Sequence, residues 1–300
     1  MKNYALLFLL SIPFLSCEKN KKYKVCNGSF AFVEKYNHNR MRLLEIDDNT
    51  GSPGDVYFET DDWPGNGVYN SSKNCYYNFS RSRRGQIYFY KFDFTIDTIT
   101  DIEYYGTMDT FKVKTQLLCN NTNDKTYYIS IGQSGERLYA LTIGATVTEK
   151  LLYISDTLYT ISSPVIDEKT GYIYFANGPN LIKIDPNSGA STLVATYSNV
   201  HLSDLHFNKN DGFFYGVNTF SYPYTFIKVN TENGSVIELS EINYVDSGTY
   251  YCHTFDVCNN RYIIGWRGAI YWIDCSNGSV VRRSAPGFSQ FEYYIEQSGL

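Results

Sequence analysis

The sequence predicts an all-β chain: a β-propeller of about six four-stranded antiparallel blades, with seven blades as the alternative count. Three observations support this prediction: an aromatic-rich composition, a repeat of about 45 residues, and turn signals between short alternating strands. Tyr and Phe contribute 29 and 19 of the 300 residues, whereas Pro contributes only 8. Aromatic residues favour the half-buried pleated surface of a sheet, so this composition indicates strands.

The repeat is clearest in three segments near the C-terminus, each an alternating strand, a turn from Asp or Asn to Gly, and a second apolar strand. These segments are residues 181–189, 226–234 and 270–278. Their turn residues Asp185, Asn230 and Asp274 are separated by 45 and 44 positions. The same step leads back to further copies at residues 138–143, 86–93 and 41–51. Units of ~40–50 residues match the period of propeller blades, whereas an irregular β-sandwich, the alternative, would need no regular step.

A second hairpin precedes the repeated segment in each of the later copies. Asp167–Gly171 and Asn208–Gly212 each lead into a short apolar run, and such turns are strong hairpin signals. Each repeat is therefore expected to hold four strands, A to D, in a meander. One blade cannot bury both of its faces, so the blades must stack around an axis. Residues 291–295 are expected to form a closing strand beside the N-terminal blade.

The repeat, of the form apolar-x-apolar-Asp-x-x-x-Gly, resembles that of six-bladed propellers of the TolB-like type. The resemblance covers essentially residues 26–290, and because the motif is generic it implies a fold without an activity. Lactonase-like six-bladed propellers carry a calcium cage of Glu, Asn and Asp. No matching set is assigned in this sequence, so no cofactor is expected.

The N-terminus resembles the signal of a bacterial lipoprotein. Lys2 provides a positive start, and the apolar run at residues 4–14 is too short to span a bilayer. Residues 14–17, Phe-Leu-Ser-Cys, resemble a lipobox, which implies that Cys17 is acylated and becomes the mature N-terminus. The alternative is an ordinary cleaved signal with an incidental cysteine.

Three segments follow from this interpretation: a signal peptide at 1–16, the lipidated cysteine and a tether at 17–25, and the propeller at 26–300. The chain is expected to be exported and anchored by its lipid in the bacterial cell envelope, on the periplasmic or outer-surface side. Net charge is −5 with both signs scattered, which excludes an obvious nucleic-acid surface. Membrane contact is expected through the lipid anchor only.

Ligand contacts are expected on the face that carries the B–C loops and the D-to-A connections, because these loops vary on a rigid scaffold. The candidate residues are His38, Asp61, Asp62, Trp63, Arg81, Arg83, Arg84, Tyr222, Tyr224, Trp266 and Arg267. The Trp63 loop and the Arg81 loop are assigned to adjacent blades, so an acidic-aromatic patch is expected beside a basic one. The alternative is that Asp61 and Asp62 pair with the arginines on a solvated face.

Histidines offer the main candidates for a site in the central channel. His201, His206 and His253 are expected on or near the A strands of blades five and six, with Asp204 or Asp256 nearby. Two histidines five residues apart on a strand face opposite ways, however, and no established metal-ligand spacing is present. The sequence also lacks a nucleophile elbow, a Walker loop and a dinucleotide fingerprint. No metal and no catalytic residues are therefore predicted.

The cysteines other than Cys17 are even in number, which permits disulfides outside the cytoplasm. They are Cys26, Cys75, Cys119, Cys252, Cys258 and Cys275. Cys258 and Cys275 are expected on one face and within bridging range, and Cys26 is a rival partner for Cys258. Free buried thiols are the alternative.

The predicted function is that of a non-enzymatic binding or scaffold protein for an unknown protein or glycan at the cell envelope. A scaffold role would require an apolar patch on the outer strands or on one face. The alternative is a propeller hydrolase or lyase with its active site at the mouth of the central channel.

Overall fold

The computed structural model describes the propeller in fifteen ranges. These are residues 29–35, 40–46, 53–60, 63–64, 67–70, 72–81, 87–95, 98–105, 116–132, 135–155, 161–243, 252–256, 259–266, 269–284 and 291–295. The elements assigned within these ranges are twenty-five strands. No helix long and apolar enough to cross a membrane occurs in them.

The strands form six meanders, which we number as blades 1 to 6 along the chain and describe from the inner strand outwards. Blade 1 contains β25 (Phe291–Ile295), β1 (Ser29–Lys35), β2 (Arg40–Ile46) and β3 (Pro53–Thr60). Blade 2 contains β4 (Trp63–Pro64) and β5 (Val68–Asn70), which both pair with β6 (Cys75–Arg81), then β7 (Ile87–Asp93) and β8 (Thr98–Tyr105). Blade 3 contains β9 (Gln116–Asn120), β10 (Lys125–Gly132), β11 (Gly135–Ile143) and β12 (Thr146–Ile154).

The last three blades are regular four-stranded sheets. Blade 4 contains β13 (Ile161–Ile166), β14 (Ile173–Asn177), β15 (Asn180–Ile184) and β16 (Ser191–Thr196). Blade 5 contains β17 (Leu202–Asn208), β18 (Phe213–Asn218), β19 (Tyr224–Asn230) and β20 (Val236–Ile242). Blade 6 contains β21 (Cys252–Asp256), β22 (Arg261–Trp266), β23 (Ala269–Asp274) and β24 (Val280–Ser284).

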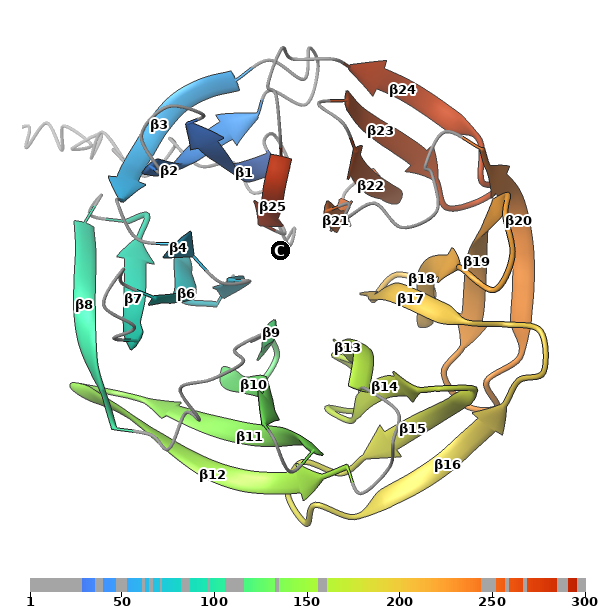
Figure 1. Ribbon diagram of the computed structural model, residues 1–300, viewed down its shortest axis with the longest axis horizontal. Helices are drawn as coiled ribbons and strands as arrows, with labels where there is room; N and C mark the ends of the chain where they lie inside the picture. The colour runs from blue at the N-terminus through green and yellow to red at the C-terminus, as the bar shows by residue number, and fades with distance from the viewer. Residues whose placement is uncertain are drawn as a thin grey trace, which may run out of the picture.

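The blades are arranged as a ring with the first strand of each near the centre and the last at the rim (Figure 1). Blades 2 and 3 share one nine-stranded sheet, because β8 and β12 pair in parallel at the rim. The ring is closed by β25, which pairs antiparallel with β1 from Phe30 opposite Ile295 to Val33 opposite Phe291. The predicted propeller and its closing strand are both confirmed.

The turn after the first strand follows one pattern in blades 2 to 6. A buried Asn or Asp, the last residue of that strand or the one directly after it, accepts a backbone N–H two or three residues later with its side-chain oxygen. These residues are Asn70, Asn120, Asp167, Asn208 and Asp256. Four positions later the chain enters the left-handed region, at Asn74, Asp124, Gly171, Gly212 and Asn260. The local turn chemistry therefore sets the hairpin at the same point in each of these blades.

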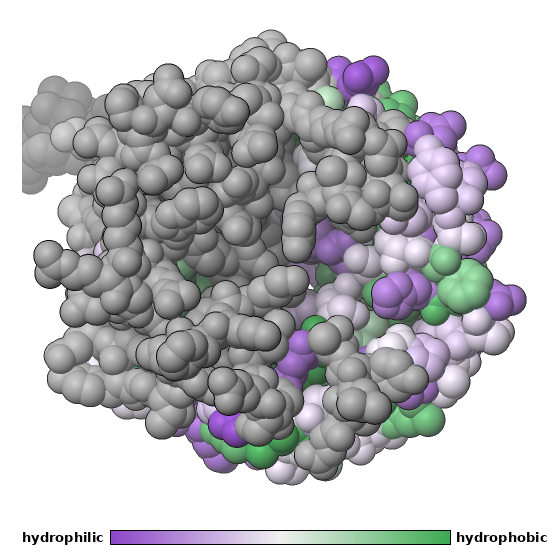
Figure 2. All heavy atoms as spheres, in the orientation of Figure 1, coloured by the Kyte–Doolittle hydropathy of each residue, from purple (hydrophilic) through white to green (hydrophobic). Residues whose placement is uncertain are grey.

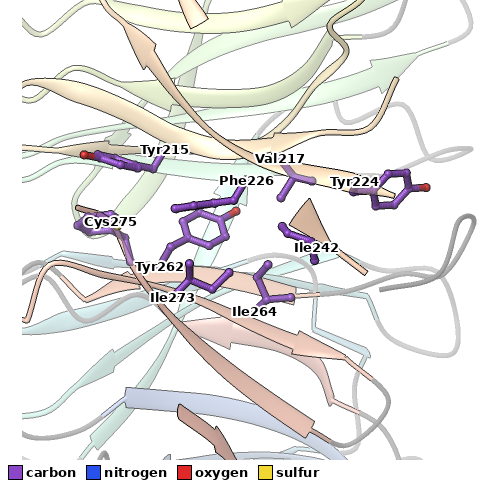
Figure 3. Close-up of a cluster of buried hydrophobic side chains, with 10 residues drawn as sticks. Tyr215, Val217, Tyr224, Phe226, Ile242, Tyr262, Ile264, Ile273 and Cys275 are labelled. Carbon is purple, nitrogen blue, oxygen red and sulfur yellow. The ribbon is translucent and has the colours of Figure 1, made fainter. Parts of the chain in front are cut away.

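The core lies between neighbouring blades. Figure 3 shows the side chains of β18 and β19 meeting those of β22 and β23. The rings of Phe226 and Tyr262 lie 5.3 Å apart at the middle of this cluster, and both residues are fully buried. Burying a large side chain stabilises a fold by ~1.5–3 kcal/mol, so these contacts hold each blade against the next.

The structure corrects the expectation for one cysteine. Cys275 lies in the turn between β23 and β24, as expected, but it is a buried free thiol that packs into the core between blades 5 and 6. Burial raises the pKa of this thiol. Its predicted disulfide is absent from the structure, and the free-thiol alternative describes Cys275. Cys26 and Cys258 lie outside the described residues.

The rim exposes aliphatic side chains on several blades. Leu193 on β16, Ile237 on β20 and Val281 on β24 are all exposed, each on the outer strand of a different blade. In the coloured part of Figure 2 the hydrophobic residues occupy separate places with hydrophilic residues between them. Singly exposed apolar side chains are normal for a protein surface, so the described rim does not show the large patch that a scaffold role would require.

Candidate functional site

A chain of polar side chains links the innermost strands of blades 4, 5 and 6. It starts at Asp204 on β17, where the strand is irregular between Ser203 and His206 and Asp204 adopts a left-handed φ of 57°. Blade 4 has a matching irregularity between Ser162 and Val165. A left-handed conformation at a residue other than glycine costs about 1–3 kcal/mol and persists only when its surroundings hold it.

Groups from three blades hold Asp204 in place. Its backbone N–H donates to Ser163 Oγ of blade 4 at 2.6 Å, and its carbonyl oxygen accepts a hydrogen bond from the Tyr262 hydroxyl of blade 6 at 2.6 Å. The Ser203 hydroxyl donates to Asp204 Oδ2 at 2.5 Å. The remaining carboxylate oxygen, Oδ1, lies 2.7 Å from His253 Nε2 on β21. The backbone of Asp204 is therefore held by blades 4 and 6, and its carboxylate is held by Ser203 of its own blade and His253 of blade 6.

The carboxylate is the first member of a line of hydrogen-bonded groups. His253 presents Nε2 to Asp204, while its Nδ1 lies 2.6 Å from His206 Nε2. In the tautomer that donates its Nε2 proton to this carboxylate, His253 presents an unprotonated Nδ1 to His206 Nε2. The side chains of His253 and Asp204 remain 17% and 21% exposed, which leaves them in reach of solvent.

The environment keeps His206 neutral. Burial lowers the pKa of this imidazole well below its ordinary value, and the neighbouring His253 lowers it further. Asp204 acts in the opposite direction. The ring of His206 lies edge-on to the rings of His253 and Tyr262, at centroid distances of 4.8 and 5.7 Å.

The prediction that histidines lie on or near the inner strands of blades 5 and 6 is confirmed. The contact between His206 and His253, however, was not predicted. Sequence reasoning compared His201 with His206, which are five residues apart on one blade. The histidines that meet are His206 and His253, which are 47 positions apart, about one repeat. That spacing was the available signal, because residues one repeat apart fall on adjacent blades. Asp256 is not part of this chain and instead caps its turn by accepting the Asn259 N–H.

A second feature lies where two loops of blade 5 meet. We call His201, Thr219, Phe220 and Tyr222 the blade-5 pad. Buried Asn218 joins the two loops, since its side-chain oxygen accepts the N–H groups of His201 at 2.9 Å and Phe220 at 3.1 Å. Thr219 N–H also donates to the His201 carbonyl, and its hydroxyl lies 3.1 Å from His201 Nδ1.

The pad presents two exposed aromatic rings. Phe220 is 56% exposed and Tyr222 is 55% exposed, and the Tyr222 hydroxyl donates to the Asn243 carbonyl. Tyr222, one of the ligand candidates from the sequence, lies at the surface. Tyr224 requires a correction: it is only 9% exposed because it packs into the core between blades 5 and 6 (Figure 3).

Two further candidates belong to the same blade, which corrects the assignment to adjacent blades. Trp63 on β4 and Arg81 on β6 are register partners within blade 2, so their backbones lie side by side. Trp266 is the last residue of β22, at the start of its B–C loop. The other candidates lie outside the described residues. They are His38, Asp61, Asp62, Arg83, Arg84 and Arg267.

The described residues contain no group of three or more His, Cys, Asp or Glu side chains placed to hold a metal ion. The arrangement that does exist is a carboxylate and two imidazoles in line. Such a line fixes tautomers and can carry a proton along its length. The fold and this line of side chains together define the molecule as a β-propeller with polar groups on the inner strands of its ring.

Comparison with known proteins supports the fold. No family model and no curated protein matches the chain. Among solved structures, a chain in the nidogen/laminin complex is similar with a TM-score of 0.64 and 10% identity, over 90% of this chain and 97% of that one. TolB from Acinetobacter baumannii is similar with a TM-score of 0.69 and 11% identity, over 91% and 68%. Apo AztD from Citrobacter koseri gives 0.52 and 12%, over 90% and 98%. At such identities the likeness shows the propeller fold alone.

Proposed function

We propose that this chain is an exported, lipid-anchored β-propeller that acts as a non-enzymatic binding protein at the cell envelope, with its ligand on the blade-5 pad. The observation that carries the proposal is the pair of exposed rings, Phe220 and Tyr222, on a loop anchored by buried Asn218. The ligand is a protein or a glycan, since an aromatic ring offers an apolar face to either.

The pad is suited to binding because it is organised before a ligand arrives. Asn218 already fixes the backbone at His201 and Phe220, so little loop entropy remains to be lost on association. Residues on loops over a rigid scaffold are common binding residues. The nidogen/laminin complex contains a chain of this fold, which makes a protein ligand reasonable for such a scaffold.

The lipid anchor is proposed from residues 14–17, with Cys17 as the acylated residue. Cells that express the full chain should incorporate an alkyne-labelled fatty acid into it and retain it in the membrane fraction. Cys17→Ser should abolish the label and release the chain. Labelling that persists in Cys17→Ser would contradict the anchor without affecting the propeller.

The binding proposal is tested on the full chain in mild detergent, with envelope glycans on an array and with chemical cross-linking in the intact envelope. Phe220→Ala combined with Tyr222→Ala should weaken ligand binding by about tenfold or more, since hot-spot aromatics contribute ≥ ~2 kcal/mol. Leu193→Ala is the matched control, because Leu193 is 57% exposed but lies on the rim. Equal binding by the double variant and the control would place the ligand elsewhere.

A further inference from the structure

We propose that His206 and His253 together form a binding site for a transition-metal ion that prefers imidazole ligands, such as Zn²⁺, Co²⁺, Ni²⁺ or Cu²⁺, on the inner wall between blades 5 and 6. This proposal goes beyond the binding function of the blade-5 pad and does not depend on it. It stands on how the two rings face each other and on what holds them.

The first argument is the direct approach of two nitrogen atoms that can each ligate a metal ion. His206 Nε2 and His253 Nδ1 lie 2.6 Å apart on strands of two different blades. Both strands border the centre of the ring (Figure 1). Without an ion, a proton must lie between these two nitrogens, since two lone pairs would otherwise face each other. An ion can take the place of that proton.

The second argument is the support of the far side of His253. An imidazole that binds a metal almost always donates its other N–H to a carboxylate, a carbonyl or water. His253 Nε2 lies 2.7 Å from Asp204 Oδ1, which favours the tautomer with the proton on Nε2 and the lone pair on Nδ1, toward His206. Asp204 is in turn fixed by Ser163, Ser203 and Tyr262. Asp204 keeps a left-handed backbone because blades 4 and 6 hold it there, and this backbone places its carboxylate against one imidazole, as in a preorganised site.

The geometry can accept an ion with a small adjustment. At a Zn–N distance of ~2.0–2.1 Å and a tetrahedral angle, the two nitrogens would be roughly 3.3 Å apart, so they would separate by less than an ångström. Binding uses the His206 tautomer that carries its proton on Nδ1, so that His206 Nε2 and His253 Nδ1 both present lone pairs to the ion. Water or a guest molecule fills the remaining positions, because only two protein ligands are present.

The donor type decides which ions are accepted. Imidazole suits Zn, Cu, Ni and related ions, whereas Ca²⁺ and Mg²⁺ require oxygen ligands. The one carboxylate here is already used by His253 and Ser203. Calcium and magnesium are therefore not expected to bind at this place.

Titration of the tag-free full chain in detergent tests the proposal, with Zn²⁺ followed by calorimetry and Co²⁺ by its visible absorption. His206→Asn and His253→Asn should each weaken binding at least tenfold. Asp204→Asn should weaken it by about 10–100-fold, as loss of an outer-shell partner does. His201→Asn is the matched control for the metal site. It removes an exposed histidine of blade 5 that does not contact His206 or His253, so Zn²⁺ binding should be unchanged.

A measurement on the unmodified chain guards against variants that fail to fold. Modification by diethyl pyrocarbonate, read by mass spectrometry, should be suppressed by Zn²⁺ at His206 and His253 and unaffected at His201. No protection, or equal binding by His206→Asn and the parent chain, would mean that the pair holds a shared proton only, and the proposal would be wrong. The Phe220 and Tyr222 variants should bind Zn²⁺ normally, so failure of the pad would not be confused with failure of this site.

Discussion

At the scale of single residues, one turn lacks a contact that two of its equivalents make. Asn70 donates its amide to Asp124 of the next blade, and Asn208 donates to Asn260 of the next blade. The acceptor in both cases is the left-handed residue of the turn. Asn120 faces Gly171 at that position, and its buried Nδ2 finds no hydrogen-bond acceptor among the described residues. The acceptor is missing because Gly171 has no side chain to provide one.

Gly171→Asn is expected to stabilise the protein. An added Cβ would lie 3.5 Å from Asn120 Nδ2, which is ordinary contact, and Asn tolerates the left-handed region better than most residues. The new hydrogen bond should contribute roughly 0.5–1.5 kcal/mol, partly offset by the loss of glycine's freedom, so the melting temperature should rise by about 1–3 °C.

Gly171→Ala is the control for that substitution, because it adds the Cβ without an acceptor. With a φ of +78° it should lower the stability by about 1–2 kcal/mol. Thermal unfolding of the two variants and the parent distinguishes the outcomes. If Asn and Ala lower the melting temperature equally, the bond from Asn120 does not form.

At the scale of elements, the turn between the third and fourth strands of each later blade rests on the outer strand of the preceding blade. The Gly234 carbonyl accepts a hydrogen bond from the Tyr197 hydroxyl at 2.7 Å, and the Gly278 carbonyl accepts one from Ser240 Oγ at 2.6 Å. These carbonyls belong to blades 5 and 6, and their donors follow or lie in the outer strands of blades 4 and 5. The glycine needed for the turn thus also permits the approach of the neighbouring blade.

Gly234→Ala should therefore cost more than a glycine substitution elsewhere. Its Cβ would lie 2.5 Å from Ala195 Cβ, and φ is +71°. Backbone strain and overpacking together should lower the free energy of unfolding by about 2–4 kcal/mol, measured in denaturant. Gly144→Ala is the control, because its Cβ would lie 3.8 Å from the Thr146 carbonyl oxygen, which is ordinary contact. A similar small loss in both variants would contradict the close packing of the turn.

The same turns carry an acid-sensitive contribution. Hydrogen bonds from the Ser276 hydroxyl and backbone N–H lower the pKa of Asp274. A carboxyl whose folded pKa is depressed stabilises the protein above its unfolded pKa, near pH 4, and loses that contribution as the pH falls through the folded value. Asn230 accepts the equivalent backbone N–H in blade 5 without a charge.

Asp274→Asn should accordingly keep the turn and flatten the acid side of the stability curve. The free energy of unfolding, measured from pH 2 to 6, should fall less steeply below pH 4 in the variant than in the parent. Parallel curves would mean that Asp274 has the same proton affinity in the folded and unfolded chains.

The sequence predicted the elements well because turn residues act locally. Asp185, Asn230 and Asp274 each form a hairpin turn through contacts within five residues. The regular spacing of these turns could therefore be recognised from the sequence alone. The inner-wall site was predicted only in part. The contact of His206 with His253 depends on the exact stagger of two blades and on the irregular backbone at Asp204, and neither is encoded by local spacing.

At the scale of the whole molecule, the ring depends on a pairing between its two ends. The inner strand of blade 1 is β25 at the C-terminus, whereas β1, β2 and β3 come from the N-terminus. A propeller blade cannot bury its faces alone, so every blade relies on both neighbours. Because β25 also approaches β21 of blade 6, its loss would open the ring at one seam.

Truncation after residue 290 is expected to destabilise the entire propeller, since it removes β25 and the antiparallel pairing from Phe30 to Val33. The melting temperature should fall by roughly 10 °C or more, because several kcal/mol of pairing and burial are lost and each kcal/mol corresponds to about 2–4 °C in a chain of this size. Truncation after residue 295 keeps β25 and should leave the melting temperature nearly unchanged. If the two truncations melt alike, the ring is held by contacts between blades alone, and the closing strand contributes nothing to its stability.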